Sequence, residues 1–291
     1  MKRTSQFLIL ILLLAASLTA SGLTQDEALA RFQRDEIMVE TQDELQEVID
    51  ALIVAHSADP ANRLILTSLA QVHFVMADAF LTDHDAKKAT YETGQLYGEA
   101  ALRLNPAFVA AEDADGFVAA VALADDVAAV HWTAANWTAK DEYDVLGAIF
   151  RGDPPKLLAL FERAMELDPG YAHGAPYRSL GAFWSGLPRL GVGTFTQNLD
   201  RSREALCHVV VDPDRCGACT GCPDVDDAVG YFENRVFYVR FVLIKTEAWE
   251  TAEAVLLSVL AEPVGDTYPL YNRVNHERAR RYLKQVREHL P

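Results

Sequence analysis

All four cysteines of the chain lie in one short segment, and such a cluster could do three kinds of chemistry. Their spacing is Cys207-x8-Cys216-x2-Cys219-x2-Cys222. Two adjacent C-x2-C steps followed by proline are similar to part of a ferredoxin run, and four thiolates could equally hold zinc. An even number of cysteines in an oxidising compartment more often forms disulfides. We predict two disulfides that staple the loop at 207–223, with a metal or cluster and redox-active thiols as alternatives.

A second group of residues combines aromatic rings with hydrogen-bonding side chains on two expected helices. It consists of His131, Trp132 and Asn136 on the first helix and of Tyr177, Arg178 and Trp184 on the second. Trp132 and Asn136 are four residues apart and therefore share a helix face. An aromatic wall with an amide donor suits a concave ligand site, although the same rings could be core packing between helices. We predict a ligand site lined by these six residues, in which Arg178 pairs with a carboxylate, or otherwise with Glu166.

No set of residues in the sequence has the spacing of an enzyme active site. There is no Gly-x-Ser-x-Gly, no phosphate-binding loop and no dinucleotide fingerprint, and the eight histidines form no His-x3-His pair. Acidic pairs such as Asp125-Asp126 have the character of helix-start charges that complement the helix dipole. We therefore expect neither catalysis, nor a cofactor, nor a bound metal.

The N-terminus has the pattern of an export signal. A leucine-rich run from Phe7 to Leu18 follows Lys2 and Arg3, and it ends in small residues that suit cleavage after Ala20 or Gly22. The run is too short for a membrane span of roughly 20 residues, although a retained membrane anchor is the alternative. No cysteine precedes Cys207, so no lipid anchor is expected. We predict a signal peptide at 1–22 and one domain at 23–291 in the periplasm.

Composition and charge narrow the classes of partner. Half of the residues are hydrophobic, which is typical of a globular protein, and the formal net charge is −16. Loss of Lys2 and Arg3 with the signal peptide lowers this charge to −18. A surface that acidic repels phosphate backbones and anionic lipid head groups, so we expect no nucleic-acid binding.

The elements that must position these residues are helices. Thr41 to Glu44 form a capping box before a helix that stops at Ser57–Pro60. We expect further helices over 64–80, up to Leu104, over 107–122, 126–139 and 143–151, and up to Leu167. The segment 231–245 could be a strand by composition, but we interpret it as a helix.

Several helix pairs carry traces of a tetratricopeptide repeat. Phe161-x2-Ala164-x4-Pro169 has the spacing of the second helix of such a repeat, and Leu180-Gly181-x2-Trp184 is close to the spacing of the first. A small alanine lets paired helices approach closely, and proline ends the second helix. The predicted fold is an all-α, TPR-like solenoid.

Longer motifs resemble one family. They are the segment from His131 to Trp137, the Ala164-Met-Glu-Leu-Asp-Pro-x-Tyr171 motif, Gly174 to Pro188, the helix pair from Phe241 to Pro263, and the Leu270-Tyr-Asn-Arg-Val-Asn-x-Glu-Arg-Ala279 motif that continues to Leu283. Together these motifs resemble the TatT family, the T components of tripartite ATP-independent periplasmic (TRAP) transporters. The sequence departs from the family pattern because it lacks a lipidated N-terminal cysteine and carries the cysteine cluster.

The resemblance implies an all-helical periplasmic protein that associates with the solute-binding P component of the transporter. It also implies a cleft for a small apolar ligand and a homotrimer. The resulting hypothesis is a non-enzymatic transporter accessory. The alternatives are a general TPR-like scaffold of the cell envelope without a ligand, and a redox or iron–sulfur protein built around the cysteines.

Overall fold

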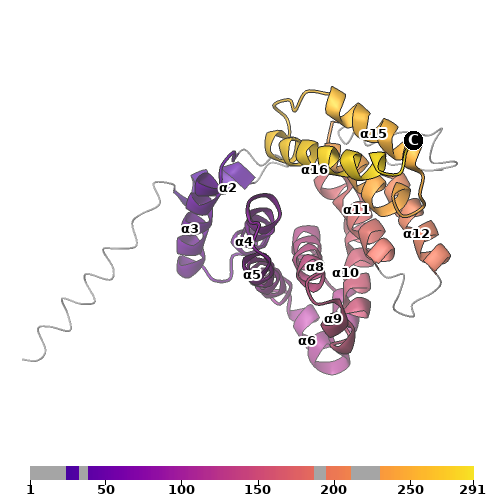
Figure 1. Cartoon of the computed structure of the whole chain (residues 1–291). Coiled ribbons are helices and arrows are strands. Elements are labelled where there is room, and N and C mark those ends of the chain that lie inside the picture. Colours follow the sequence, from indigo (N-terminus) through magenta and orange to yellow (C-terminus); the bar gives the residue numbers. More distant parts are fainter. Residues whose placement is uncertain (1–23, 33–38, 187–194, 211–229) are drawn as a thin grey trace, which may run out of the picture.

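The computed structural model describes residues 24–32, 39–186, 195–210 and 230–291, and every regular element in them is a helix (Figure 1). The elements are α2 (Gln25–Phe32), α3 (Gln42–Ala58), α4 (Arg63–Val75), the π-helical turn η1 (Met76–Phe80), α5 (His84–Leu102), α6 (Pro106–Asp115), α7 (Phe117–Val121), α8 (Val127–Asp141), α9 (Val145–Phe150), α10 (Asp153–Leu167), α11 (Tyr171–Gly186), α12 (Phe195–Cys207), α14 (Phe232–Tyr238), the π-helical turn η3 (Val239–Leu243), α15 (Trp249–Ala261) and α16 (Pro269–Arg287). The all-helical prediction is confirmed for these residues, while the tetratricopeptide type of repeat stays a prediction. The predicted signal peptide at 1–22 lies outside the described residues, so the division into signal and domain is not tested.

Side-chain caps start most helices of the N-terminal half. The caps are Thr41 of α3, Asn62 of α4, Asp83 of α5, Asn105 of α6, Asp126 of α8 and Asp144 of α9. Each side-chain oxygen accepts a hydrogen bond from a backbone N–H of the first turn, which stabilises a helix by about 1 kcal/mol. The predicted capping box is confirmed, because Thr41 accepts from the N–H of Glu44 and the Glu44 carboxylate accepts from the N–H of Thr41.

Three predicted helices differ in detail from the observed ones. The helix expected over 64–80 changes from α to π geometry at Met76, and the helix within 231–245 does so at Val239. The segment expected to be continuous over 107–122 is broken at Gly116, whose φ of 86° ends α6 and starts α7. Glycine adopts this left-handed backbone without steric cost. The preference for helix over strand in 231–245 is confirmed.

The helices follow one another around a curve (Figure 1). Sequential neighbours pack together from α3 through α4, α5, α8, α10, α11 and α12, and α14, α15 and α16 complete the C-terminal side. Phe161 and Ala164, the positions of the predicted repeat motif, are fully buried in the core cluster of the central helices. None of the described helices combines the length and the apolar character needed to cross a bilayer.

Helices from the two ends of the described part of the chain share one apolar cluster. Leu29 of α2 and Leu45 of α3 share this cluster with Leu270 and Tyr271 of α16. Arg273 of α16 also forms an exposed ion pair with Glu40, at 3.6 Å. The last helix thus reaches the segment just before α3 through this ion pair and shares an apolar cluster with α2 and α3.

Close approach of α5 and α8 depends on two glycines. A Cβ atom at Gly94 would clash with the Asn136 side chain, and one at Gly98 would clash with the Thr133 side chain. Both partners are fully buried and lie on α8. The small residues on α5 thus set the distance between these two helices.

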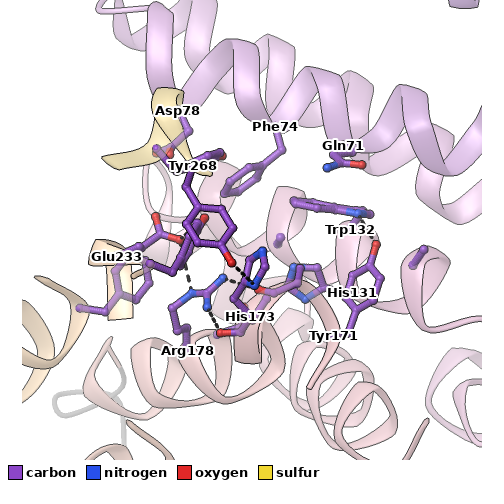
Figure 2. A pocket seen from close by; sticks show the side chains of 18 of the residues that line it. Gln71, Phe74, Asp78, His131, Trp132, Tyr171, His173, Arg178, Glu233 and Tyr268 are labelled. Carbon is purple, nitrogen blue, oxygen red and sulfur yellow. Dashed lines mark hydrogen bonds and ion pairs between the residues drawn. The ribbon is translucent and has the colours of Figure 1, made fainter. Parts of the chain in front are cut away.

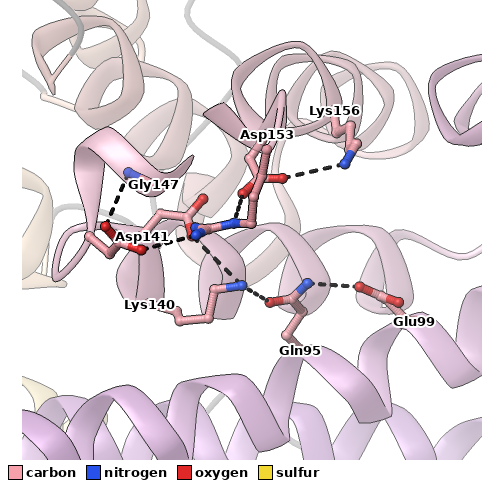
Figure 3. Close-up of polar contacts among 9 residues, drawn as sticks. Gln95, Glu99, Lys140, Asp141, Gly147, Asp153 and Lys156 are labelled. Carbon is pink, nitrogen blue, oxygen red and sulfur yellow. Dashed lines mark hydrogen bonds and ion pairs between the residues drawn. The ribbon is translucent and has the colours of Figure 1, made fainter. Parts of the chain in front are cut away.

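A polar cluster fixes the C-terminal end of α8 to its neighbours (Figure 3). Arg151 bridges Asp141 at the end of α8 and Asp153 at the start of α10, at 3.0 and 2.8 Å. Lys140 donates to Gln95 of α5, at 2.7 Å. The carboxylates are thus engaged by cations, and we interpret the cluster as part of the scaffold.

Candidate functional site

A cavity of about 280 Å³ lies inside the curve of helices (Figure 2). Its lining comes from seven elements that are far apart in the sequence. They are α4 (Gln71, Phe74), η1 (Asp78), α8 (His131, Trp132, Ala135), α11 (Tyr171, His173, Arg178), α14 (Glu233, Phe237), η3 (Arg240) and α16 (Tyr271, Arg278), together with Tyr231 and Tyr268 just before two of these helices.

Aromatic rings form much of the cavity wall. The Phe74 ring centroid lies 5.6 Å from that of Trp132, and the Trp132 indole N–H donates to the hydroxyl of Tyr171 at 2.9 Å. On the other side, the rings of His173, Tyr231 and Tyr268 contact one another with centroid separations of 4.5 to 5.2 Å. These contacts hold the rings in place before any ligand arrives, which lowers the entropic cost of binding.

Four charged side chains alternate in sign along one side of the cavity. Arg278 contacts Asp78 at 2.7 Å and Glu233 at 3.1 Å, and the other Glu233 oxygen lies 3.3 Å from Nε of Arg178. Arg178 and Glu233 are almost fully buried. A buried charge is tolerated only when it is paired and hydrogen-bonded, and each of these charges has an opposite partner.

The chain at the start of α11 adopts a left-handed conformation that Arg178 holds in place. Ala172 and His173 have φ angles of 46° and 60°, and Gly174 has 78°. Nη2 of Arg178 donates to the Ala172 carbonyl at 2.9 Å, and Nη1 donates to the His173 carbonyl at 2.6 Å. Left-handed non-glycine residues cost of order 1–3 kcal/mol and cluster at functional sites. Here the strained turn places His173 against Tyr268 beside the cavity (Figure 2).

His131 is buried at the cavity wall, next to Trp132 and Tyr171. Burial, and secondarily the positive charge of Arg178, lowers the pKa of His131 to about 3. The imidazole is therefore neutral at pH 7, with one nitrogen that donates and one that accepts. Its Nδ1 atom has no hydrogen-bond partner among the described residues.

Of the six residues predicted to line a ligand site, the structure brings three to the cavity. His131, Trp132 and Arg178 line it. Arg178 pairs with a carboxylate, that of Glu233, and the alternative with Glu166 is wrong because Glu166 pairs with Arg163. Whether the three residues bind a ligand stays a prediction.

Asn136, Tyr177 and Trp184 lie outside the cavity lining. Asn136 is fully buried and donates to the carbonyls of Ala70 and Trp132, so it joins α8 to α4. Tyr177 stacks on His208, and Trp184 packs in the central core cluster. These three side chains support the helices around the cavity.

Several cavity residues were missed by the sequence reasoning. They are Phe74, Asp78, His173, Tyr231, Glu233, Tyr268, Tyr271 and Arg278. Tyr271 and Arg278 belong to the C-terminal motif by which the chain resembles the TatT family, so that motif was the signal available. The remaining residues carry no spacing that would mark them.

The cysteine cluster is described only at its first member. Cys207 is buried at the end of α12, whereas Cys216, Cys219 and Cys222 lie outside the described residues. The disulfide prediction is therefore not tested. Within the described ranges, no group of three or more His, Cys, Asp or Glu side chains is arranged to hold a metal ion.

The described residues form an all-helical fold that curves around an aromatic cavity whose rings are already ordered by contacts with one another. Comparison with known families gives a closer placement. The family model described as TAtT, TRAP transporter T-component, matches residues 45–205, more than half of the chain. The chain belongs to this family, and the resemblance inferred from its motifs is confirmed. No curated protein sequence matches the chain significantly.

Proposed function

We propose that this protein is a non-enzymatic, exported accessory of a TRAP transporter that binds a small ligand in its cavity and docks onto the solute-binding P component. Membership of the T-component family supports the role in transport. The observation that carries the ligand-binding part is the cavity, whose aromatic wall is already ordered by ring contacts and by the Trp132–Tyr171 hydrogen bond.

Charge supports an electrostatic component in the docking. The net charge is −16, or −18 once the proposed signal peptide is removed with Lys2 and Arg3. We expect the P component to present lysine and arginine side chains, because complementary charge accelerates association and favours the correct partner. Attraction between exposed charges weakens as salt shortens the Debye length to less than about 10 Å.

Native mass spectrometry of the mature protein, alone and with the P component, tests this proposal. We expect a trimer, a mass lower by two hydrogens for each of two disulfides, and a complex that weakens as salt rises. Absence of a complex at every salt concentration would favour the alternative, a TPR-like envelope scaffold. A metal adduct on the cysteines would favour the redox or iron–sulfur alternative.

A further inference from the structure

One face of α4 and η1 lines the cavity with polar side chains on both sides of an aromatic ring. Ser68, Gln71, Phe74 and Asp78 follow one another at intervals of three or four residues, and all four line the cavity. Figure 2 shows Gln71 on the Trp132 side of Phe74 and Asp78 on the opposite side. A ligand that contacts these rings therefore meets hydrogen-bonding groups at both of its ends.

Three neutral polar side chains of the lining are not engaged within the protein. The side chains of Ser68 and Gln71 make no hydrogen bond to the described residues, and the same holds for the hydroxyl of Tyr271 on α16. None of their polar atoms is sealed in the interior, in contrast to Nδ1 of His131. Hydroxyl and amide groups both donate and accept hydrogen bonds. The cavity therefore offers three groups that can bond to ligand hydroxyls in either sense.

Asp78 adds an acceptor that its ion pair does not use. Arg278 donates to Oδ1 of Asp78 at 2.7 Å, and Oδ2 makes no hydrogen bond to the described residues. A carboxylate has about four lone-pair sites, so Asp78 can accept from a ligand hydroxyl and keep its arginine. The charges of Asp78, Arg278, Glu233 and Arg178 sum to zero along this side of the cavity. They leave no net charge to compensate a charged ligand.

The aromatic part of the lining suits the face of a saturated ring. The centroids of Phe74 and Trp132 lie 5.6 Å apart, and the indole N–H is already bonded to Tyr171, so Trp132 offers its ring to a ligand. The negative face of an aromatic ring attracts weakly positive C–H groups, such as those on one side of a sugar ring. The volume of about 280 Å³ lies just below the range of about 300–1,000 Å³ for drug-sized ligands, which suits a single substituted ring.

We propose that the cavity binds an uncharged, hydroxyl-rich ligand, a monosaccharide in its pyranose form, stacked on Trp132 and hydrogen-bonded to Gln71 and Asp78. This inference rests on the proposed function, because it names the ligand class of the same cavity. It departs from the small apolar ligand that the family resemblance implies. An apolar ligand that fills the cavity would leave the polar side chains of this wall without hydrogen bonds, which costs free energy.

Ring-matched probes separate the contribution of hydroxyl groups from those of apolar contact and charge. The neutral probes are the methyl pyranosides of glucose, galactose and mannose, the apolar probe is methoxycyclohexane, and the anionic probe is methyl glucuronide. Each is titrated into the mature protein at pH 7 by isothermal titration calorimetry. We expect at least one methyl pyranoside to bind at least tenfold more tightly than methoxycyclohexane and methyl glucuronide, because a single hydrogen bond can account for about that factor.

Three variants assign the preference to the wall formed by α4. Gln71→Met removes the amide at nearly constant shape, and it should weaken binding of the tightest pyranoside about tenfold. Ser68→Ala is a smaller change and should weaken the same binding at least twofold. Gln46→Met makes the matched change at an exposed site on α3, outside the lining, and should leave the affinity unchanged. Cooperative unfolding followed by circular dichroism verifies that each variant is folded.

The outcomes distinguish this inference from the proposed function. Tightest binding of methoxycyclohexane would overturn the hydroxyl-rich class and tightest binding of methyl glucuronide the uncharged class, while ligand binding by the cavity would stand in both cases. Equal pyranoside affinities of Gln71→Met and Gln46→Met would overturn the role of Gln71. If no probe binds in the millimolar range while the P-component complex forms, this inference and the ligand-binding part of the proposed function both fail, and the docking part stands.

Discussion

Arg178 shows how one side chain can organise a site through its contacts with the protein itself. Its guanidinium pairs with Glu233 and holds the carbonyls of Ala172 and His173, so it fixes the left-handed turn at the start of α11. The sequence left open whether this arginine pairs with a carboxylate at the ligand site or with Glu166, and it did not indicate Glu233. It could not indicate the turn, because a positive φ is uncommon for any non-glycine residue, alanine and histidine included.

Replacement of Arg178 by methionine tests this positioning role. The change leaves Glu233 without one of its two arginines and releases the turn, so we expect a loss of about 3–5 kcal/mol in the free energy of unfolding, measured by urea denaturation. Arg287→Met is the matched control. It removes an exposed arginine that pairs with Glu253, and it should cost less than about 1 kcal/mol. Equal effects of the two changes would contradict the positioning role of Arg178.

The low pKa of His131 predicts how stability depends on pH. The folded-state pKa of about 3 lies below the ordinary value of 6.5, so the unfolded chain binds more protons between these pH values. Stability is therefore retained above pH 6.5 and falls as the pH drops towards 3. At pH 4.5 the loss due to His131 should be about 3 kcal/mol.

His131→Asn supplies the comparison for this pH dependence. Urea unfolding of both proteins from pH 7 to pH 4.5 should give a steeper decline in stability for the wild type. The burial of His73 also lowers the pKa of that residue, and this contribution is present in both proteins. Parallel declines would show that His131 does not titrate as an isolated buried imidazole.

At the scale of elements, periodicity and capping residues predicted most helices and many of their ends. They did so because both signals are local, as at Thr41 and Asp126, whose side chains bond within the next turn. The π turns at Met76–Phe80 and Val239–Leu243 were not predicted, since they leave the apolar pattern nearly unchanged. These turns carry the cavity residues Asp78 and Arg240, in agreement with the frequent occurrence of π turns at functional sites.

The packing of α5 on α8 predicts a strong effect of a very small substitution. In Gly98→Ala, the new Cβ would clash with Oγ1 of Thr133 and lie 3.0 Å from its Cα. Since Thr133 is fully buried and its hydroxyl bonds to the Ala129 carbonyl, the helices must move apart. We expect a loss of about 1–3 kcal/mol in the free energy of unfolding, despite the better helix propensity of alanine.

A glycine in open space provides the control for that measurement. Gly186 ends α11, and a Cβ there would meet no atom of the described residues within 4 Å. Gly186→Ala should therefore change the unfolding free energy by less than about 1 kcal/mol. A Gly98→Ala protein as stable as the wild type would show that α5 and α8 can separate at little cost.

At the scale of the whole molecule, the sequence predicted an all-helical chain but could not locate the cavity. Its wall joins Phe74 of α4, Trp132 of α8 and Tyr271 of α16, and no local pattern reports that these helices meet. The same reason explains Asn136. It shares a helix face with Trp132, yet the approach of α4 places the Ala70 carbonyl within its reach and draws the amide into the core.

Closure of the curve depends on Arg278, which joins α16 to η1 and α14. Arg278→Met removes a cation that pairs with both Asp78 and Glu233. We expect limited proteolysis to cleave both α16 and the helices α2 and α3 faster than in the wild type. Both rates should rise because these helices belong to one apolar cluster. Arg281→Met, on the exposed face of the same helix, is the control and should leave both rates unchanged. Faster cleavage of α16 alone would contradict the coupling of the two ends.

The contacts that close the cavity also have a consequence for the order of folding. Arg278 and Asp78 are separated by 200 residues, and Arg273 reaches Glu40 across 233. Contacts between such distant residues form slowly, whereas α4, α5 and α8 are close in sequence and can pair early. Each molecule should therefore fold through an open intermediate with folded central helices, and only the docking of α16 completes a chamber able to enclose a ligand.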